Sequence, residues 1–255
     1  MKALAQRLSS SEAVIGSFIG LGHPSVVELA GCSGFDFVVI DMEHSLTNLE
    51  TVENMARAAA WAGIDAIVRV PTVDETLIGK LLDAGISGVQ VPQVTSREYA
   101  ETAVAAAKYP PVGTRGFMPV SRASRFLSIT KEEHIARSNA ESVVVAQVEG
   151  VEGLESIDEI LGTPGLNVVF LGPYDLSMSL GFPGQVNHPS VVGAIDRAIC
   201  RAKEMDVRVG IFADDAASAR RYIDQGVNYI TVGLDATYLS NAFKSCIAGI
   251  KGLRQ

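Results

Sequence analysis

Polar side chains stand at the ends of five consecutive short apolar runs in this chain. Each run has the length and the β-branched content of a buried strand. In chain order, the groups at their ends are Asp41, Glu43 and His44; Arg69; Gln90 and Gln93; Gln147 and Glu149; and Tyr174 and Asp175. One such residue alone is more often a helix cap or a solvated loop residue. Five neighbouring runs that all end this way predict a polar ring, as expected of an active site.

Two members of this ring are costly to bury without a partner. Glu149 ends a valine-rich run, where a carboxylate must find a partner or shift its pKa. Arg69 stands between Val68 and Val70, so its guanidinium needs an anion. Asp175 has a simpler alternative, because an aspartate before Leu-Ser is also a plausible helix N-cap.

A pair of carboxylates gives an oxygen-rich site suited to a hard divalent cation such as Mg²⁺ or Mn²⁺. The cysteines and histidines are too scattered for a zinc site. A cation beside Arg69 would receive a 2-oxo acid and stabilise enolate charge, and His44 would transfer protons. Schiff-base chemistry is not expected, because none of the chain's lysines closes a predicted strand.

The elements that must position these groups alternate regularly along the chain. Helical patterns separate eight strand-like runs, which cover residues 17–21, 35–41, 66–70, 88–91, 142–148, 167–171, 207–212 and 229–232. In a chain of 255 residues this alternation predicts a single (β/α)₈ TIM barrel over residues 1–255, with an open Rossmann sheet as the alternative. Catalytic residues of such barrels lie at the C-terminal ends of the strands, where the polar ring falls.

Apolar spacing of three and four residues predicts the helices between these strands, at residues 49–62, 76–84, 97–108, 191–205 and 216–225. Gly63, Gly85 and Gly226 follow three of them, as is typical of the residue after a helix end. About fifty residues separate the fourth and fifth strands, which predicts a long loop on the upper face of the barrel. The last helix, Tyr238–Leu253, has one apolar stripe; we interpret it as packed on its own barrel, with a helix that bridges subunits as the alternative.

The composition excludes several classes of protein. A net charge of −8 without any basic cluster argues against a nucleic-acid partner. The N-terminus lacks the apolar core of a signal peptide, and no run reaches the roughly 18 apolar residues of a spanning helix, so no membrane partner is expected. The three cysteines Cys32, Cys200 and Cys246 form no CxxC pair, which indicates a reducing, cytoplasmic compartment.

Six segments resemble, in order, the metal-dependent class II pyruvate aldolases of the HpcH/HpaI type: GFDFVVIDMEHS, VRVP, LLDAGISGVQVPQV, YPPVGTRG, QVE and LGPYDLSMSLG. The resemblance runs from about Gly16 to the C-terminus. This family includes the 4-hydroxy-2-oxoheptanedioate and 2-dehydro-3-deoxyglucarate aldolases. It implies a carbon–carbon lyase that reversibly cleaves a 4-hydroxy-2-oxo acid into pyruvate, or a close 2-oxo acid, and an aldehyde through a metal-stabilised enolate.

The resemblance also implies roles for the charged residues. Glu149 and Asp175 match the metal ligands, for Mg²⁺ or Mn²⁺ with Co²⁺ as a further option. Arg69 matches the arginine that holds pyruvate and stabilises the enolate, and His44 matches the base, which acts through water. Asp83 matches a carboxylate that raises the basicity of this histidine, although its place in the chain alone indicates an ordinary helix-surface residue.

Further roles are implied for residues that contact substrate or water. The substrate-contacting positions are Arg69, Gln147, Gly172, Pro173 and Tyr174. Asp41 and Glu43 match residues that order metal-bound water. Tyr174 stands where relatives commonly have a small residue, which predicts a narrower pocket or an added hydroxyl group.

The resemblance implies a hexamer in which the last helix packs on a neighbouring subunit, opposite to the interpretation from its periodicity. The expected small-molecule partners are a 2-oxo acid and an aldehyde. Two alternatives remain at this point: a related metal-enolate lyase or decarboxylase of the oxaloacetate or acyl-CoA type, and a non-catalytic protein that binds 2-oxo acids. Carbon dioxide release from oxaloacetate would indicate the first, and binding of pyruvate without exchange of its methyl protons would indicate the second.

Overall fold

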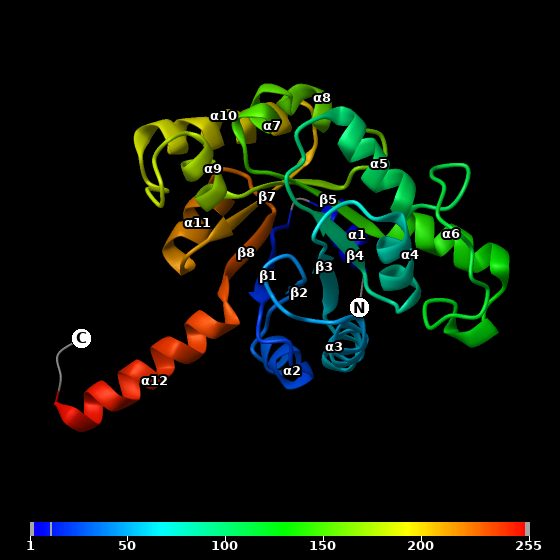
Figure 1. Cartoon of the computed structure of the whole chain (residues 1–255), viewed down its shortest axis with the longest axis horizontal. Helices are drawn as coiled ribbons and strands as arrows, with labels where there is room; N and C mark the ends of the chain where they lie inside the picture. Colours follow the sequence, from blue (N-terminus) through cyan, green and yellow to red (C-terminus); the bar gives the residue numbers. More distant parts are fainter. Residues whose placement is uncertain (1–2, 11, 253–255) are drawn as a thin grey trace.

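The computed structural model describes residues 3–10 and 12–252, and its centre is a closed barrel of parallel strands (Figure 1). Each strand pairs with the next one along the chain, and the last pairs with the first. The strands are β1 (Val14–Ile19), β2 (Phe37–Asp41), β3 (Asp65–Arg69), β4 (Gly88–Val91), β5 (Val143–Val148), β6 (Val168–Leu171), β7 (Arg208–Ala213) and β8 (Tyr229–Leu234). This topology confirms the predicted (β/α)₈ barrel and excludes the open Rossmann sheet.

Helices surround the barrel and follow most strands directly (Figure 1). Their bounds are α1 (Leu4–Leu8), α2 (Pro24–Cys32), α3 (Leu49–Ala62), α4 (Glu75–Asp83), α5 (Arg97–Ala107), the 3₁₀ turn η1 (Arg125–Leu127), α6 (Lys131–Glu141), α7 (Val151–Glu155), α8 (Ile157–Leu161), α9 (Pro173–Ser179), α10 (Pro189–Glu204), α11 (Ala216–Asp224) and α12 (Asp235–Lys251). Gly63, Gly85 and Gly226 have positive φ angles just after their helices, as predicted.

Two separate apolar clusters hold this fold together, because successive strand residues point to opposite sides of the sheet. Val38 and Ile40 of β2 belong to the cluster between strands and helices, whereas Phe37 belongs to the cluster inside the barrel. There the Phe37 ring stacks on Tyr229 with centroids 4.4 Å apart. A Cβ atom on Gly16 would lie 2.5 Å from the Phe37 ring, so glycine makes room for it.

The long segment between β4 and β5 does not lie on the upper face of the barrel, and that prediction was wrong. α5 uses the first part of the segment to carry the chain back to the end of the barrel where the strands begin. There the Lys108 Nζ donates to the carbonyl oxygen of Asn139, 2.9 Å away, and to that of Ser142, just before β5. The backbone N–H of Ala123 donates to the carbonyl of Asp83 at the end of α4. The loop of residues 108–130 therefore lies at the lower end of the barrel, beside the ends of α4 and α6.

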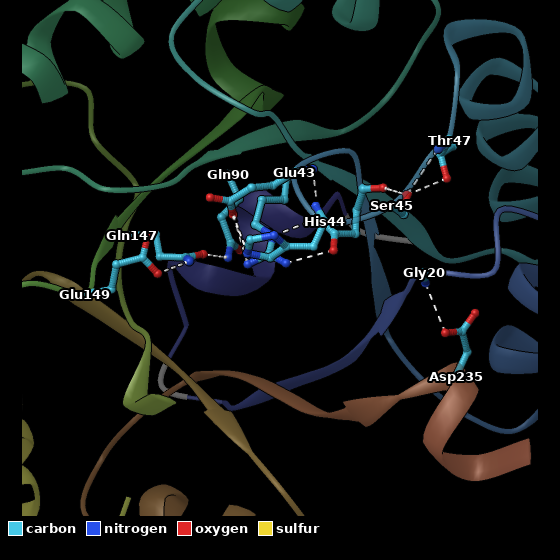
Figure 2. A network of polar contacts seen from close by, with 11 residues as sticks. Gly20, Glu43, His44, Ser45, Thr47, Gln90, Gln147, Glu149 and Asp235 are labelled. Carbon is cyan, nitrogen blue, oxygen red and sulfur yellow. Dashed lines mark hydrogen bonds and ion pairs between the residues drawn. The ribbon is translucent and has the colours of Figure 1, made fainter. Parts of the chain in front are cut away.

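The last helix, α12, projects away from the barrel instead of packing on it (Figure 1). Asp235 is its buried residue, and its carboxylate accepts a hydrogen bond of 3.0 Å from the backbone N–H of Gly20 (Figure 2). It accepts a second, also of 3.0 Å, from the backbone N–H of Leu21. The interpretation of this helix as packed on its own barrel was wrong, and its expected end, Leu253, lies outside the described residues. No helix in the described part of the chain has the length and apolar character needed to cross a membrane.

Candidate active site

The strand ends bring the predicted polar ring together around two adjoining cavities. The larger, of about 580 Å³, is lined by residues that include Glu43, Gln93 and Glu149. The smaller, of about 280 Å³, is lined by residues that include Asp41, Arg69, Gln147, Gly172, Pro173 and Tyr174. His44 and Asp175 line both cavities, so they stand at the boundary between them.

Arg69 finds the anion that its apolar neighbours require. The register of β2 and β3 places it opposite Asp41. Its Nε and Nη2 donate to Asp41 Oδ1 and Oδ2 at 2.9 and 2.8 Å, and its Nη1 lies 3.1 Å from Glu43 Oε2. Burial alone would lower the pKa of Arg69, but the hydrogen bonds and charge of Asp41 raise it, so the guanidinium stays charged.

The turn that follows β2 is organised by the same aspartate. Asp41 Oδ1 accepts from the backbone N–H groups of Glu43 and His44, and Ser45 Oγ donates to the Asp41 carbonyl (Figure 2). Glu43 is thereby buried, which raises its pKa. The imidazole of His44 is 68% exposed, with Nε2 3.9 Å from Glu43 Oε2. Its exposure leaves this ring free to exchange protons with bound substrate or water.

Glu149 ends a chain of buried amide groups (Figure 2). Gln90 Nε2 donates to Gln147 Oε1, and Gln147 Nε2 donates to Glu149 Oε2. The backbone N–H of Gln93 donates to Glu149 Oε1 at 2.8 Å. Burial, together with the smaller effects of the Asp175 and Glu43 carboxylates, raises the pKa of Glu149 to about 7 against the lowering effect of these hydrogen bonds.

Gly172 lets the carboxylates of Glu149 and Asp175 approach one another. It is the N-cap of α9, and Asp175 lies in the first turn, so Asp175 is not the cap itself. The position that a Cβ atom would take on Gly172 lies 3.0 Å from Glu149 Oε2 and 3.9 Å from Asp175 Oδ2. Any larger residue would displace Glu149.

This donor set fits part of the oxygen shell of a hard divalent cation. Glu149 and Asp175 supply two carboxylates, and the described residues contain no group of three or more His, Cys, Asp or Glu side chains placed to hold a metal ion. The remaining ligands would be water and substrate oxygens. Glu43 Oε2 is buried without a hydrogen bond, although it faces Arg69, and it is therefore free to accept one from water in the site.

Asp83 is not part of this cluster. It ends α4, and its Oδ1 accepts a 2.6 Å hydrogen bond from Nη2 of the buried Arg115. Its neighbours Leu82 and Gly85 line a separate cavity of about 560 Å³. The expected pairing of Asp83 with His44 is therefore not made within one chain, because a helix after a barrel strand ends at the face opposite the strand ends.

Sequence reasoning missed the residues that complete the smaller cavity, which are Phe18, Phe170, Phe212 and Leu234. A phenylalanine inside a strand looks the same in sequence whether it fills the core or lines a pocket. The position of these residues near the C-terminal ends of their strands could have identified them as pocket residues. It also missed Gln93 as a partner of Glu149, because Gln93 contributes its backbone N–H.

Comparison with known proteins gives the relatives of this chain. The model of the HpcH/HpaI aldolase/citrate lyase family matches residues 14–242. A hydroxypyruvate/pyruvate aldolase from Pseudomonas aeruginosa is 37% identical over 248 residues, which cover 97% of this chain and 92% of the relative. A 5-keto-4-deoxy-D-glucarate aldolase from Shigella boydii is 35% identical over 89% of this chain and 88% of the relative.

Comparison with solved structures supports the same family. The crystal structure of an HpcH/HpaI aldolase from Desulfitobacterium hafniense superposes with a TM-score of 0.94 at 31% identity, and it covers 100% of this chain and 98% of the other. Aldolases thus match almost the whole chain in both sequence and structure. The chain therefore belongs to the HpcH/HpaI aldolase/citrate lyase family and is a carbon–carbon lyase.

Proposed function

We propose that this protein is a divalent-metal-dependent aldolase that reversibly cleaves 4-hydroxy-2-oxo acids into pyruvate, or a close 2-oxo acid, and an aldehyde. The observation that carries the proposal is the position of Arg69. Its guanidinium is fixed by Asp41 and lines a cavity that it shares with Asp175. Cationic and oxygen-rich groups side by side suit a substrate with a carboxylate and a neighbouring ketone.

Arg69 and Gln147 would bind the 2-oxo acid. Asp41 occupies Nε and one hydrogen of Nη2, so Arg69 keeps further N–H groups for the carboxylate and for the oxygen on which enolate charge develops. The amide of Gln147, which lines the same cavity, is oriented by Gln90 and Glu149. A divalent cation held by Glu149 and Asp175 would act as a Lewis acid on the 2-oxo group.

His44 would move the proton. In the cleavage direction it accepts the proton of the C4 hydroxyl through a water molecule, and the aldehyde carbonyl forms as the C3–C4 bond breaks. The electron pair of that bond passes to the 2-oxo acid half, where Arg69 stabilises the enolate. His44 suits this work because its ring lines both cavities and is exposed.

The test follows pyruvate from 4-hydroxy-2-oxo acids in the presence of Mg²⁺ or Mn²⁺. We expect pyruvate release that chelation abolishes and that Glu149→Gln reduces by about 100-fold or more. Glu155→Gln, in an exposed helix position, is the matched control and should retain full activity. Exchange of the pyruvate methyl protons in deuterated water reports enolisation without any choice of aldehyde. Absence of both pyruvate release and exchange would refute the proposal.

A second copy of this chain is the partner that α12 fits best. The helix exposes a stripe of large apolar side chains, namely Tyr238, Leu239, Phe243, Ile247 and Ile250. In the part of the chain that the structure describes these side chains are exposed, and a homo-oligomer, of which a hexamer is the expected form, would bury them. An Asp83 that acts on His44 would have to come from another copy, because the Asp83 of the same chain ends α4 at the face of the barrel opposite the strand ends.

A further inference from the structure

Four polar side chains are joined by hydrogen bonds from the interior of the barrel to the carboxylate of Glu149, and we name them the buried network. The network starts at Tyr229, whose hydroxyl donates to Oε1 of Gln90 over 3.4 Å. From Gln90 it continues through Gln147 to Glu149 (Figure 2). Tyr229 belongs to β8 and Gln90 to β4, two strands that do not pair, so the network crosses the inside of the barrel.

Tyr229 and Gln90 lie in surroundings where a polar group needs a partner. Both side chains are 0% exposed. The Tyr229 ring stacks on Phe37 and meets Phe170 edge-on, with centroids 6.0 Å apart. A hydroxyl or amide group buried there without a hydrogen bond would destabilise the fold. Among the described residues, the buried polar atoms without a partner include none from this network.

The two ends of the network determine its direction. A carboxylate that ligates a cation only accepts hydrogen bonds, so Gln147 turns its Nε2 toward Glu149 and its Oε1 toward Gln90. Gln90 then donates with its own Nε2, and its Oε1 is left to accept from Tyr229. Burial raises the pKa of Tyr229 well above its ordinary value, so the hydroxyl keeps the proton that it donates. Each amide therefore has a single orientation.

The orientation of the Gln147 amide matters because this side chain lines the smaller cavity. With Oε1 bonded to Gln90 and one Nε2 hydrogen bonded to Glu149, one N–H remains for the substrate. The carboxylate and ketone oxygens of a 2-oxo acid only accept hydrogen bonds, so an N–H is the group that they require. A reversed amide would turn its oxygen toward the Glu149 carboxylate, and the repulsion between the two acceptors would displace this ligand.

We infer that Tyr229 and Gln90 are positioning residues, which fix the Gln147 amide so that it holds Glu149 in place as a ligand of the cation. The inference rests on the proposed metal-dependent function and adds two residues that lie outside the lining of both cavities. They act through the direction of their hydrogen bonds, whereas the apolar side chains around them act by filling space.

The experiment measures the Kd of Mn²⁺ by titration of the metal-free protein, with free Mn²⁺ followed by electron paramagnetic resonance. Tyr229→Phe keeps the ring and removes the hydroxyl, and we expect it to raise the Kd by about two- to fivefold. Gln90→Met keeps the approximate size and leaves Gln147 Oε1 unpaired, so it should raise the Kd by about five- to tenfold. The double variant should match Gln90→Met, because without Gln90 the Tyr229 hydroxyl has no connection to Glu149.

Thr231→Val is the matched control. Thr231 follows Tyr229 on the same face of β8, is 0% exposed, and donates a hydrogen bond of 3.4 Å to the carbonyl of Ile211, outside the network. This change should leave the Kd of Mn²⁺ unchanged. Thermal unfolding checks that each variant is folded, and Tyr229→Phe alone tests the inference if Gln90→Met does not fold.

Three results would overturn the inference while Mn²⁺ binding and pyruvate proton exchange by the wild-type protein still support the aldolase function. The first is a Kd that the folded variants leave unchanged or lower, the second is an equal effect of Thr231→Val, and the third is effects of Tyr229→Phe and Gln90→Met that add in the double variant. A wild-type protein that neither binds Mn²⁺ nor exchanges these protons would overturn both proposals.

Discussion

Arg69 shows how one buried charge is prepared for function. Two carboxylates from the preceding strand end surround its guanidinium, and Phe18 covers one of its faces. The planar guanidinium binds both oxygens of Asp41 and still presents N–H groups to the cavity. A lysine could balance the charge, but its ammonium group is not planar and cannot donate two parallel hydrogen bonds to one carboxylate.

We therefore predict that Arg69→Lys lowers kcat/KM for 4-hydroxy-2-oxo acid cleavage by about 100-fold or more, mainly through kcat. Steady-state kinetics of pyruvate release provide the measurement. Arg97→Lys is the control, because Arg97 forms an exposed ion pair with Glu101 and should be neutral. Activity of Arg69→Lys within tenfold of wild type would show that the fork is not needed.

At this scale the sequence predicted which residues have functional side chains better than it predicted their partners. The isolated Arg69 between two valines required an anion, but the identity of that anion follows from the pairing register of β2 and β3. Gln93 was part of the predicted ring, but it acts through its backbone N–H, which every residue except proline has, so no side-chain pattern could identify its bond to Glu149. Asp83 was identified only by resemblance, and within one chain it pairs with Arg115.

Among the elements, the junction between β6 and α9 leaves little space for a side chain at Gly172. The chain turns into α9 directly beside Glu149, and Gly172 has no side chain to fill the space that the carboxylate occupies. A side chain at this position would therefore press on Glu149, whose Oε2 would lie 3.0 Å from the added Cβ atom.

We predict that Gly172→Ala displaces Glu149 and lowers activity by about tenfold or more, and that it costs about 1 to 3 kcal/mol in unfolding free energy through overpacking. Kinetics, Mg²⁺ titration and thermal unfolding measure the three effects. Gly79→Ala is the matched control in the open face of α4, where nothing lies within 4 Å of the added atom. That change should stabilise the protein by about 0.5 to 1 kcal/mol.

The loop of residues 108–130 is anchored by a buried ammonium group. Burial, with a smaller effect of the nearby Arg115 charge, lowers the pKa of Lys108 to about 8. Below pH 8 the group is charged in both the folded and unfolded states, so folding bears the full cost of burying it. Between pH 8 and the unfolded value of 10.5 the folded protein releases the proton first, and this cost is relieved.

The unfolding free energy of the wild-type protein should accordingly rise from pH 8 to pH 10 relative to that of Lys108→Met, by at most about 3 kcal/mol. Urea unfolding of the two proteins at several pH values measures the difference. Subtraction of the variant removes the titration of the tyrosines, which both proteins share. A difference that does not change with pH would mean that Lys108 is not buried as a charged group.

The bounds of the elements were predicted well where periodicity was strong, and poorly where it was short. α3 occupies the predicted residues, and α5 and α11 each end one residue early. β1 begins three residues before its predicted start, because its first residues pair with β8, and no local pattern reports such a pairing. The face on which residues 108–130 lie was predicted wrongly for a related reason: it follows from the direction in which α5 returns.

For the molecule as a whole, the barrel was predictable because each strand and helix has its own local pattern of apolar residues. The position of α12 relative to the barrel was not predictable. An apolar stripe on a helix looks the same in sequence whether it covers the helix's own barrel or another copy. The structure removes the first possibility by placing the exposed stripe away from the barrel (Figure 1).

We predict that Phe243→Glu weakens self-association, because it buries a charge in the proposed interface between copies. Sedimentation velocity across a range of concentrations should show an oligomer for the wild-type protein and smaller species for the variant. Trp61→Glu, at an exposed aromatic residue of α3, controls for loss of a surface aromatic ring. A wild-type protein that sediments as a monomer at all concentrations would contradict the oligomer.

Asp235 links two parts of the chain that lie far apart in the sequence, since its bond to Gly20 spans 215 positions. Among the barrel strands β1 is synthesised before the others, and one edge of it must wait for β8, which follows all of them in the chain. The barrel thus closes at a seam that is sealed by the first residue of the projecting helix. A protein shortened to end after Ala236 keeps the seam and loses the apolar stripe, whereas one that ends after Leu234 also loses the carboxylate that closes the ring.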